Sequence, residues 1–194
     1  SLYCDVSIKA VFLGDTGVGK TSIIVSYAQH SLPEKIPIVR HETVNIYRDS
    51  KVIQLELHDT DAREDSDRLR PLGYNGTDVI LLCFSVISPA SFERISTKWI
   101  VEARHYCPYV PIILVGTKID KREDSYTLER LKEKNLEPVT REQAESLAQE
   151  IKAEKYVECS AVGSQGLLTL IDTAVCAALY RQKKPPKRST CSIS

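Results

Sequence analysis

The segment Gly14-Asp-Thr-Gly-Val-Gly-Lys-Thr21 constrains the fold more than any other part of the chain. It satisfies the pattern G-x-x-x-x-G-K-[ST], between an apolar run at 6–13 that predicts a strand and a run at 20–29 that predicts a helix. Glycines let a backbone wrap closely around an anion, so that N–H groups and a helix N-terminus face it. A glycine turn with a chance lysine is the alternative, but the strand–loop–helix context disfavours it. The segment therefore predicts a phosphate-binding loop.

The rest of the chain alternates apolar runs with amphipathic stretches, which is the pattern of parallel strands joined by crossover helices. We predict further strands at 42–48, 52–58, 79–85, 112–115 and 156–159, and helices at 88–105, 140–152 and 167–181. Ser88 and Pro89 suit a helix start, and Thr140 with Gln143 forms a capping-box pattern. The expected fold class is α/β, with a mainly parallel six-stranded sheet flanked by helices.

The composition is that of an ordinary single-domain protein, and it excludes the class of strongly basic proteins. Lysine plus arginine (26) equals aspartate plus glutamate (26), so no global charge indicates nucleic-acid binding. The six cysteines show no paired spacing, which predicts a reducing, cytosolic compartment, and Cys83 and Cys159 lie in apolar runs that predict buried thiols. At 194 residues we expect one domain over 1–181 and a flexible tail over 182–194.

The phosphate loop also predicts how a nucleotide and its metal ion are held. Lys20 would reach the β- and γ-phosphates, and the Thr21 hydroxyl would ligate Mg²⁺. The expected cofactors are therefore a nucleotide and Mg²⁺. The predicted phosphate-contacting residues are Gly14, Asp15, Thr16, Gly17, Val18, Gly19, Lys20, Thr21 and Ser22.

A second segment, Thr117-Lys118-Ile119-Asp120, follows the apolar run at 112–115 and bears on the choice of base. A carboxylate can accept hydrogen bonds from guanine N1–H and the 2-amino group, which adenine cannot replace. The aliphatic stem of Lys118 would cover one face of the ring. A solvated Lys-Ile-Asp at a strand end is the alternative. The segment resembles the N/T-K-x-D element of GTP-binding proteins, and Ser160 and Ala161 match a third base-contacting segment, in which the Ala161 N–H would face guanine O6. GTP or GDP is expected rather than ATP.

Three longer segments, at 67–74, 83–93 and 111–120, resemble the Ras-superfamily small GTPases, specifically the Rho/Rac type. The charged stretch at 122–140 resembles the insert helix of Rho proteins, although a solvated amphipathic helix is compatible with it. The resemblance implies a P-loop NTPase fold with that insert helix, and a monomer that controls actin, polarity or membrane traffic. It also implies effector proteins, an exchange factor and a GDP-dissociation inhibitor as partners.

The residues used in hydrolysis depart from the family pattern. Thr16 stands where the family has a glycine, and the family's DTAGQE appears as the segment 59–64, DTDARE. Asp59 remains to hold the Mg²⁺ shell, whereas Ala62 replaces a glycine whose N–H approaches the γ-phosphate. Arg63 replaces the glutamine that orients the attacking water, and a guanidinium only donates hydrogen bonds. No catalytic residue is therefore assigned, and we expect GTP turnover to be slow, insensitive to Rho-type GAPs, or absent.

The first switch departs further, because the family's metal-ligating threonine aligns with Ile38, which cannot bind a metal ion. A lineage-specific switch that uses His41, Glu42 or Arg63 is the alternative. The predicted effector region comprises Lys35, Ile36, Pro37, Ile38, Val39, Arg40, His41, Glu42 and Thr43.

The C-terminal residues Cys191-Ser-Ile-Ser194 form a C-a-a-X box, in which the last serine favours farnesylation of Cys191. Basic residues at 183, 184, 187 and 188 would add attraction to an anionic leaflet. We expect the cytoplasmic side of a membrane, the plasma membrane in particular, with a cytosolic pool.

Three functions remain open on the sequence. The first is a switch that cycles between GTP and GDP and binds effectors. The second is a nucleotide-stabilised pseudo-GTPase that serves as a membrane-anchored binding module, which Thr16, Ile38 and Arg63 favour. The third, an ATP-using enzyme, is disfavoured by Asp120 and by the lack of a second substrate site in the sequence pattern.

Overall fold

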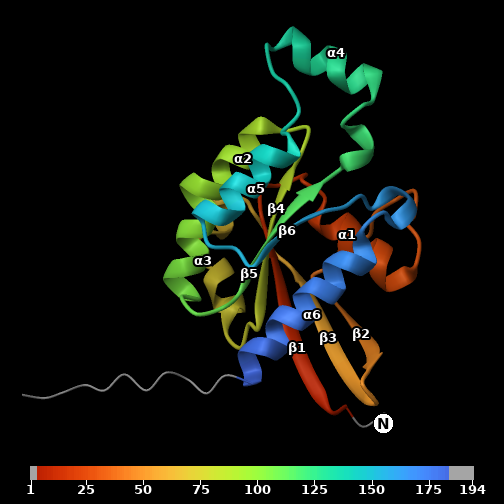
Figure 1. Ribbon diagram of the computed structural model, residues 1–194, viewed down its shortest axis with the longest axis vertical. Coiled ribbons are helices and arrows are strands. Elements are labelled where there is room, and N and C mark those ends of the chain that lie inside the picture. Colours follow the sequence, from red (N-terminus) through yellow and green to blue (C-terminus); the bar gives the residue numbers. More distant parts are fainter. Residues whose placement is uncertain (1–3, 184–194) are drawn as a thin grey trace, which may run out of the picture.

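The fold is a six-stranded sheet with helices on both faces, seen in a computed structural model that describes residues 4–183 (Figure 1). The strands are β1 Val6–Leu13, β2 His41–Arg48, β3 Lys51–Asp59, β4 Val79–Ser85, β5 Ile112–Thr117 and β6 Lys155–Glu158. Their order in the sheet is β2-β3-β1-β4-β5-β6, and only the β2–β3 pair is antiparallel. The predicted α/β class with a mainly parallel six-stranded sheet is confirmed.

The central strands are apolar because both faces of the sheet are covered. Every residue of β4 and of β5 is buried, as the near-continuous apolar runs predict. At the edge, β2 and β3 form a hairpin whose turn residues Asp49 and Ser50 have φ of 48° and 62°. Two consecutive left-handed residues match the twist of the flanking strands, so this turn fits a tight antiparallel pair.

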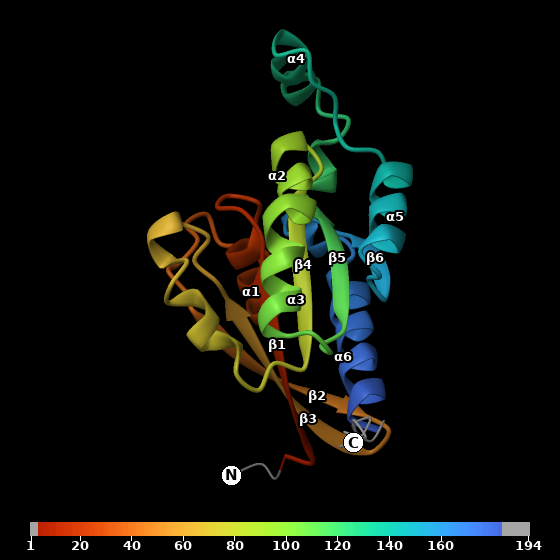
Figure 2. The same cartoon turned by 90° about the vertical axis from the view of Figure 1, so that its left-hand side faces the viewer.

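The helices form two layers, one on each face of the sheet. They are α1 Lys20–Gln29, α2 Pro89–Arg94, α3 Ile100–Tyr106, α4 Ser125–Glu133, α5 Arg141–Glu150 and α6 Leu167–Lys183. Apolar residues of α1 and α6 are buried against one face, and those of α3 and α5 against the other. Figure 2 shows α4 standing away from both layers. The predicted caps are confirmed, because the Ser88 side chain accepts from the Ser91 N–H and Thr140 forms a full capping box with Gln143.

The helix predicted over 88–105 is interrupted by a π-helical turn at Ile95–Trp99, between α2 and α3. Apolar spacing does not distinguish such a turn from an ordinary helical turn, and π-turns occur often near functional sites. The turn carries Trp99, which is fully buried.

Cys83 and Cys159 are also fully buried, as predicted, and burial raises the pKa of the Cys159 thiol to about 12.

The chain end differs slightly from expectation, because α6 runs to Lys183 rather than ending at about 181. Cys191 and most of the predicted tail lie outside the described residues, so the prenylation prediction and the domain division stay predictions. Within residues 4–183, no helix has both the length and the apolar character needed to cross a membrane.

Candidate nucleotide-binding site

The predicted phosphate loop lies between β1 and α1, at the carboxyl edge of the sheet. Gly14 has a φ of 149°, and a Cβ atom there would lie 2.1 Å from the Cys83 carbonyl oxygen of β4. Gly19, directly before α1, has a φ of 106°. Both positions require glycine, because an L side chain would clash with the neighbouring strand or strain the backbone. The loop therefore keeps its backbone close to β4 and directs it into α1.

Lys20, near the end of the phosphate loop, is buried, with only 5% of its surface exposed. Its ammonium donates to the carbonyl oxygens of Gly14 at 2.7 Å and of Asp15 at 3.0 Å. Burial lowers the pKa of Lys20, and the nearby carboxylate of Asp59 opposes that shift. An ammonium has three donors. The two carbonyl contacts therefore leave one donor for a phosphate oxygen.

Thr21 and Asp59 form the candidate metal site. The Thr21 hydroxyl donates to Asp59 Oδ2, while Asp59 Oδ1 is buried and has no hydrogen-bond partner among residues 4–183. Burial raises the pKa of Asp59. A buried oxygen without a partner is costly, and a cation would satisfy it. Mg²⁺ commonly uses one or two protein ligands and completes its shell with phosphates and water, so these two residues fit it.

Thr117 and Lys118 connect the end of β5 to the phosphate loop. The buried Thr117 hydroxyl donates to the Val18 carbonyl oxygen at 2.5 Å. Lys118 has a left-handed φ of 60°, and its ammonium donates to the Gly17 carbonyl oxygen at 2.6 Å. The Lys118 stem therefore extends from the base-binding segment to the loop, and its flank can cover a planar ring.

Asp120 lies beside the segment that follows β6. The Ser160 hydroxyl donates to Asp120 Oδ1 at 2.6 Å and accepts from the Val162 N–H at 3.0 Å. The Ala161 carbonyl oxygen accepts from the Ser26 hydroxyl of α1 at 3.0 Å. Ser160 thus orients the carboxylate, which keeps acceptor sites for the two donors on guanine.

A cavity of about 310 Å³ brings the phosphate and metal residues together. It includes Ile36, predicted as part of the effector region, and it adds Thr60 and Asp61, which the sequence analysis missed. The signal for Asp61 was present, since a carboxylate stands where the family's DTAGQE has alanine. A larger groove of about 750 Å³ lies between α2, α4 and α5 and contains none of the predicted site residues. The cavity is lined by Thr16, Gly17, Gly19, Lys20, Thr21, Ser22, Ile36, Asp59, Thr60, Asp61, Ala62 and Lys118.

Arg63 is held by Asp61. The Arg63 Nε donates to the two Asp61 carboxylate oxygens at 3.0 and 2.9 Å, and the Arg63 backbone N–H donates to Oδ1 at 3.0 Å. These hydrogen bonds keep the pKa of Asp61 far below its usual range. Ala62 between them is buried at 9% exposure. The guanidinium at the glutamine position therefore pairs with its own neighbour.

The effector region is largely irregular and exposed. Residues 35–40 lie outside regular elements, and His41, Glu42 and Thr43 open β2. The Ile38 side chain is 99% exposed, so the position of the family's metal-ligating threonine presents an apolar group to solvent. His41 stacks on His58 across the hairpin, with ring centroids 5.6 Å apart. The alternative switch that uses His41 or Glu42 stays untested.

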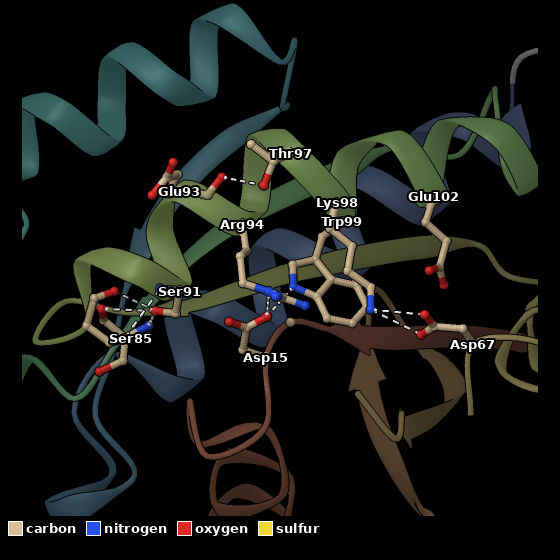
Figure 3. Close-up of polar contacts among 12 residues, drawn as sticks. Asp15, Asp67, Ser85, Ser91, Glu93, Arg94, Thr97, Lys98, Trp99 and Glu102 are labelled. Carbon is tan, nitrogen blue, oxygen red and sulfur yellow. Dashed lines mark hydrogen bonds and ion pairs between the residues drawn. The ribbon is translucent and has the colours of Figure 1, made fainter. Parts of the chain in front are cut away.

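Asp15 connects the phosphate loop to α2 and to the π-helical turn, and Figure 3 shows it between two donors. Asp15 Oδ1 accepts from Arg94 Nε at 2.8 Å and from the Trp99 indole N–H at 2.7 Å. Directly before Trp99, the Lys98 ammonium lies 3.1 Å from Asp67 Oδ1. The π-helical turn thus contacts both the loop and the segment that follows β3.

The segment that follows β3 is held by a buried arginine, Arg70, whose burial no local sequence pattern predicts. The Arg70 side chain is 1% exposed and donates to Glu102 of α3 at 2.6 and 2.8 Å, to Asp67 Oδ1 at 2.6 Å, and to the Asp61 carbonyl oxygen at 2.9 Å. The guanidinium also lies 4.9 Å from the centre of the Trp99 ring. Residues 61–70 are therefore fixed against α3.

One comparison with known proteins bears on these residues. The family model described as "Ras: Ras family" matches residues 9–179, from within β1 to within α6. The matched range contains every site residue described above, and the α/β architecture is consistent with the fold of phosphate-loop GTPases.

Proposed function

Because the chain belongs to the Ras family of GTP-binding small GTPases, we propose that it is a Rho-like signalling GTPase that acts at membranes and hydrolyses GTP slowly. The observation that carries slow hydrolysis is the pairing of Arg63 with Asp61, at the position of the water-orienting glutamine. The Rho-like assignment is supported by the sequence resemblance and by α4, a capped helix within the stretch expected to hold the insert.

Binding is assigned to residues on both sides of the phosphate loop. The loop N–H groups and Lys20 would contact the phosphates, and Thr21 with Asp59 would hold Mg²⁺. That ion, when bound, neutralises charge on the β- and γ-phosphate oxygens. Asp120 accepts from guanine, and Lys118 covers one face of the ring. Two features support these roles: Asp59 Oδ1, which has no hydrogen-bond partner within residues 4–183, and the Ser160–Asp120 hydrogen bond.

Weak hydrolysis follows from three positions. Arg63 offers only donors, and Asp61 engages two of its guanidinium nitrogens. Thr16 lines the phosphate cavity with a side chain where the family has none. Ile38 cannot complete a metal shell. In the family, a water-orienting glutamine and a GAP arginine together supply most of a roughly 10⁵-fold stimulated rate.

Single-turnover hydrolysis of bound GTP, with and without a Rho-type GAP, tests this proposal. We expect slow conversion that the GAP does not accelerate. GAP-stimulated hydrolysis comparable to that of an ordinary Rho protein would contradict the proposal. The assay needs nucleotide-loaded protein, so binding is verified independently of turnover.

A pseudo-GTPase that recruits partners without cycling is the second candidate, and the 99% exposure of Ile38 favours it. In this candidate nucleotide stabilises the fold and the exposed 35–40 segment binds a partner in every nucleotide state. Identification of the nucleotide that co-purifies separates the two. GDP with normal exchange supports the switch, slowly lost GTP supports a constitutive state, and an empty site supports a scaffold.

Effector binding is proposed for the region 35–43, and an exchange factor and a GDP-dissociation inhibitor are the other proposed partner classes. Exposed apolar groups at Ile38, Leu69 and Leu72 support a protein-binding surface on the switch segments. Membrane attachment is proposed through prenylated Cys191, at the cytoplasmic side of the plasma membrane with a cytosolic pool. Unchanged membrane partitioning of Cys191→Ser would refute the anchor.

A further inference from the structure

The acidic residue Asp61 lines the phosphate cavity. It lines the same cavity as Lys20, Thr21 and Asp59, and its side chain is 31% exposed. Its main-chain oxygen accepts from the buried Arg70 at 2.9 Å, which fixes the backbone at this point. Asp61 is therefore held in a fixed position in the wall of the cavity.

The order of strands places Asp61 at one end of a bound nucleotide. The loop follows β1, the base-binding residues follow β5 and β6, and Asp61 follows β3, on the other side of β1. A nucleotide with its base at Asp120 must therefore extend its phosphates across β1 toward the end of β3. There Thr21 and Asp59 would hold Mg²⁺ beside the phosphates. Asp61 thus lies at the γ-phosphate end.

Arg63 directs two of its three guanidinium nitrogens at Asp61. Its Nε lies within hydrogen-bond distance of both Asp61 oxygens, and its Nη2 lies 2.5 Å from Oδ2. The Arg63 side chain is 70% exposed, so it neutralises Asp61 from the solvent side. A γ-phosphate would therefore lie beside a carboxylate, and any Arg63 hydrogen bonds that it took from Asp61 would leave that carboxylate less compensated.

We propose that Asp61 is a specificity-determining residue, which makes the cavity favour guanosine diphosphate over triphosphate. The inference rests on the proposed nucleotide site and adds its regulation. With slow hydrolysis, the fraction of GTP-loaded protein depends on relative affinity and on the supply of each nucleotide. A carboxylate at the γ-phosphate end lowers that fraction without any catalytic step.

Equilibrium binding of fluorescent GDP and GTP analogues, with Mg²⁺ in excess, tests the proposal. The measured quantity is the affinity for the GTP analogue divided by that for the GDP analogue. Asp61→Asn should raise this ratio about tenfold or more, the effect of one nearby charge in a partly screened site. Asp65→Asn, the same charge change at an exposed position in the same segment, should leave the ratio unchanged.

Two further variants separate charge from shape. Asp61→Glu should keep the low ratio, because it keeps the carboxylate. Arg63→Met should lower the ratio in the native chain, because it removes the cation that compensates the Asp61 carboxylate. An unchanged ratio in Asp61→Asn that still binds GDP would overturn the inference alone. Failure of the native protein to bind either analogue would overturn the proposed nucleotide site, and this inference with it.

Discussion

Replacement of Arg70 by methionine tests the buried charge network that holds residues 61–70. The substitution leaves Glu102, whose side chain is 13% exposed, without the guanidinium that pairs with it at 2.6 Å. Removing one partner of a buried ion pair costs about 3–5 kcal/mol. Asp67 is 41% exposed and can turn to solvent, so we expect the lower end, about 3 kcal/mol. In a chain of this size that corresponds to a fall in Tm of about 6–12 °C.

Thermal and urea unfolding, followed by circular dichroism at fixed GDP and Mg²⁺, measures this loss. Arg68→Met, at an exposed arginine in the same segment, is the matched control and should change stability by less than about 0.5 kcal/mol. The double variant Arg70→Met with Glu102→Leu removes the stranded carboxylate and should recover most of the loss. A loss under about 1 kcal/mol for Arg70→Met, or a double variant no more stable than the single one, would refute the reasoning.

Three other outcomes are expected. Asp120→Asn should weaken GDP binding by about 10²–10⁴-fold in competition assays, because a guanine donor loses its acceptor; equal affinity would remove Asp120 from the base site. Gly166→Ala should destabilise the fold more than Gly163→Ala in urea unfolding: both have positive φ (72° and 66°), but only at 166 would a Cβ meet a backbone oxygen, at 2.4 Å. Burial opposes ionisation of Glu102, but its buried hydrogen bonds outweigh this and lower its pKa. Because the pKa of Glu102 is lower in the folded state than its unfolded value of about 4.3, its ionisation stabilises the fold above that pH, and this stabilisation is lost as the pH falls. Glu102→Gln should therefore flatten the decline in the free energy of unfolding below about pH 5.

The sheet and most helix boundaries could be predicted because local signals and tertiary environment agree there. Residues 79–85 are apolar and are buried on both faces of the sheet. Thr140 and Gln143 cap a helix through contacts three residues apart, which sequence spacing reveals directly. The phosphate loop could also be predicted, because Gly14 and Lys20 stand at the spacing that the motif requires, between a strand and a helix.

The charged network could not be predicted, because its partners are distant in sequence. Arg70 and Glu102 lie 32 positions apart, and nothing in either local pattern indicates that the guanidinium is buried. The π-helical turn was missed because its apolar spacing resembles that of an α-helix. The pairing of Arg63 with Asp61 could not be predicted either, because it requires side-chain geometry that composition does not contain.

Trp99 also gives the protein a built-in optical reporter, because it is the only tryptophan in the chain. Its indole N–H bonds to Asp15 of the phosphate loop at 2.7 Å, and cations of Arg70 and Lys98 lie 4.9 and 4.8 Å from the ring centre. Indole emission responds to the electric field around the ring. Tryptophan fluorescence of the unlabelled protein therefore comes from one position, which contacts the loop on one side and the segment after β3 on the other. Rearrangement of either is readable as a shift in that single emission.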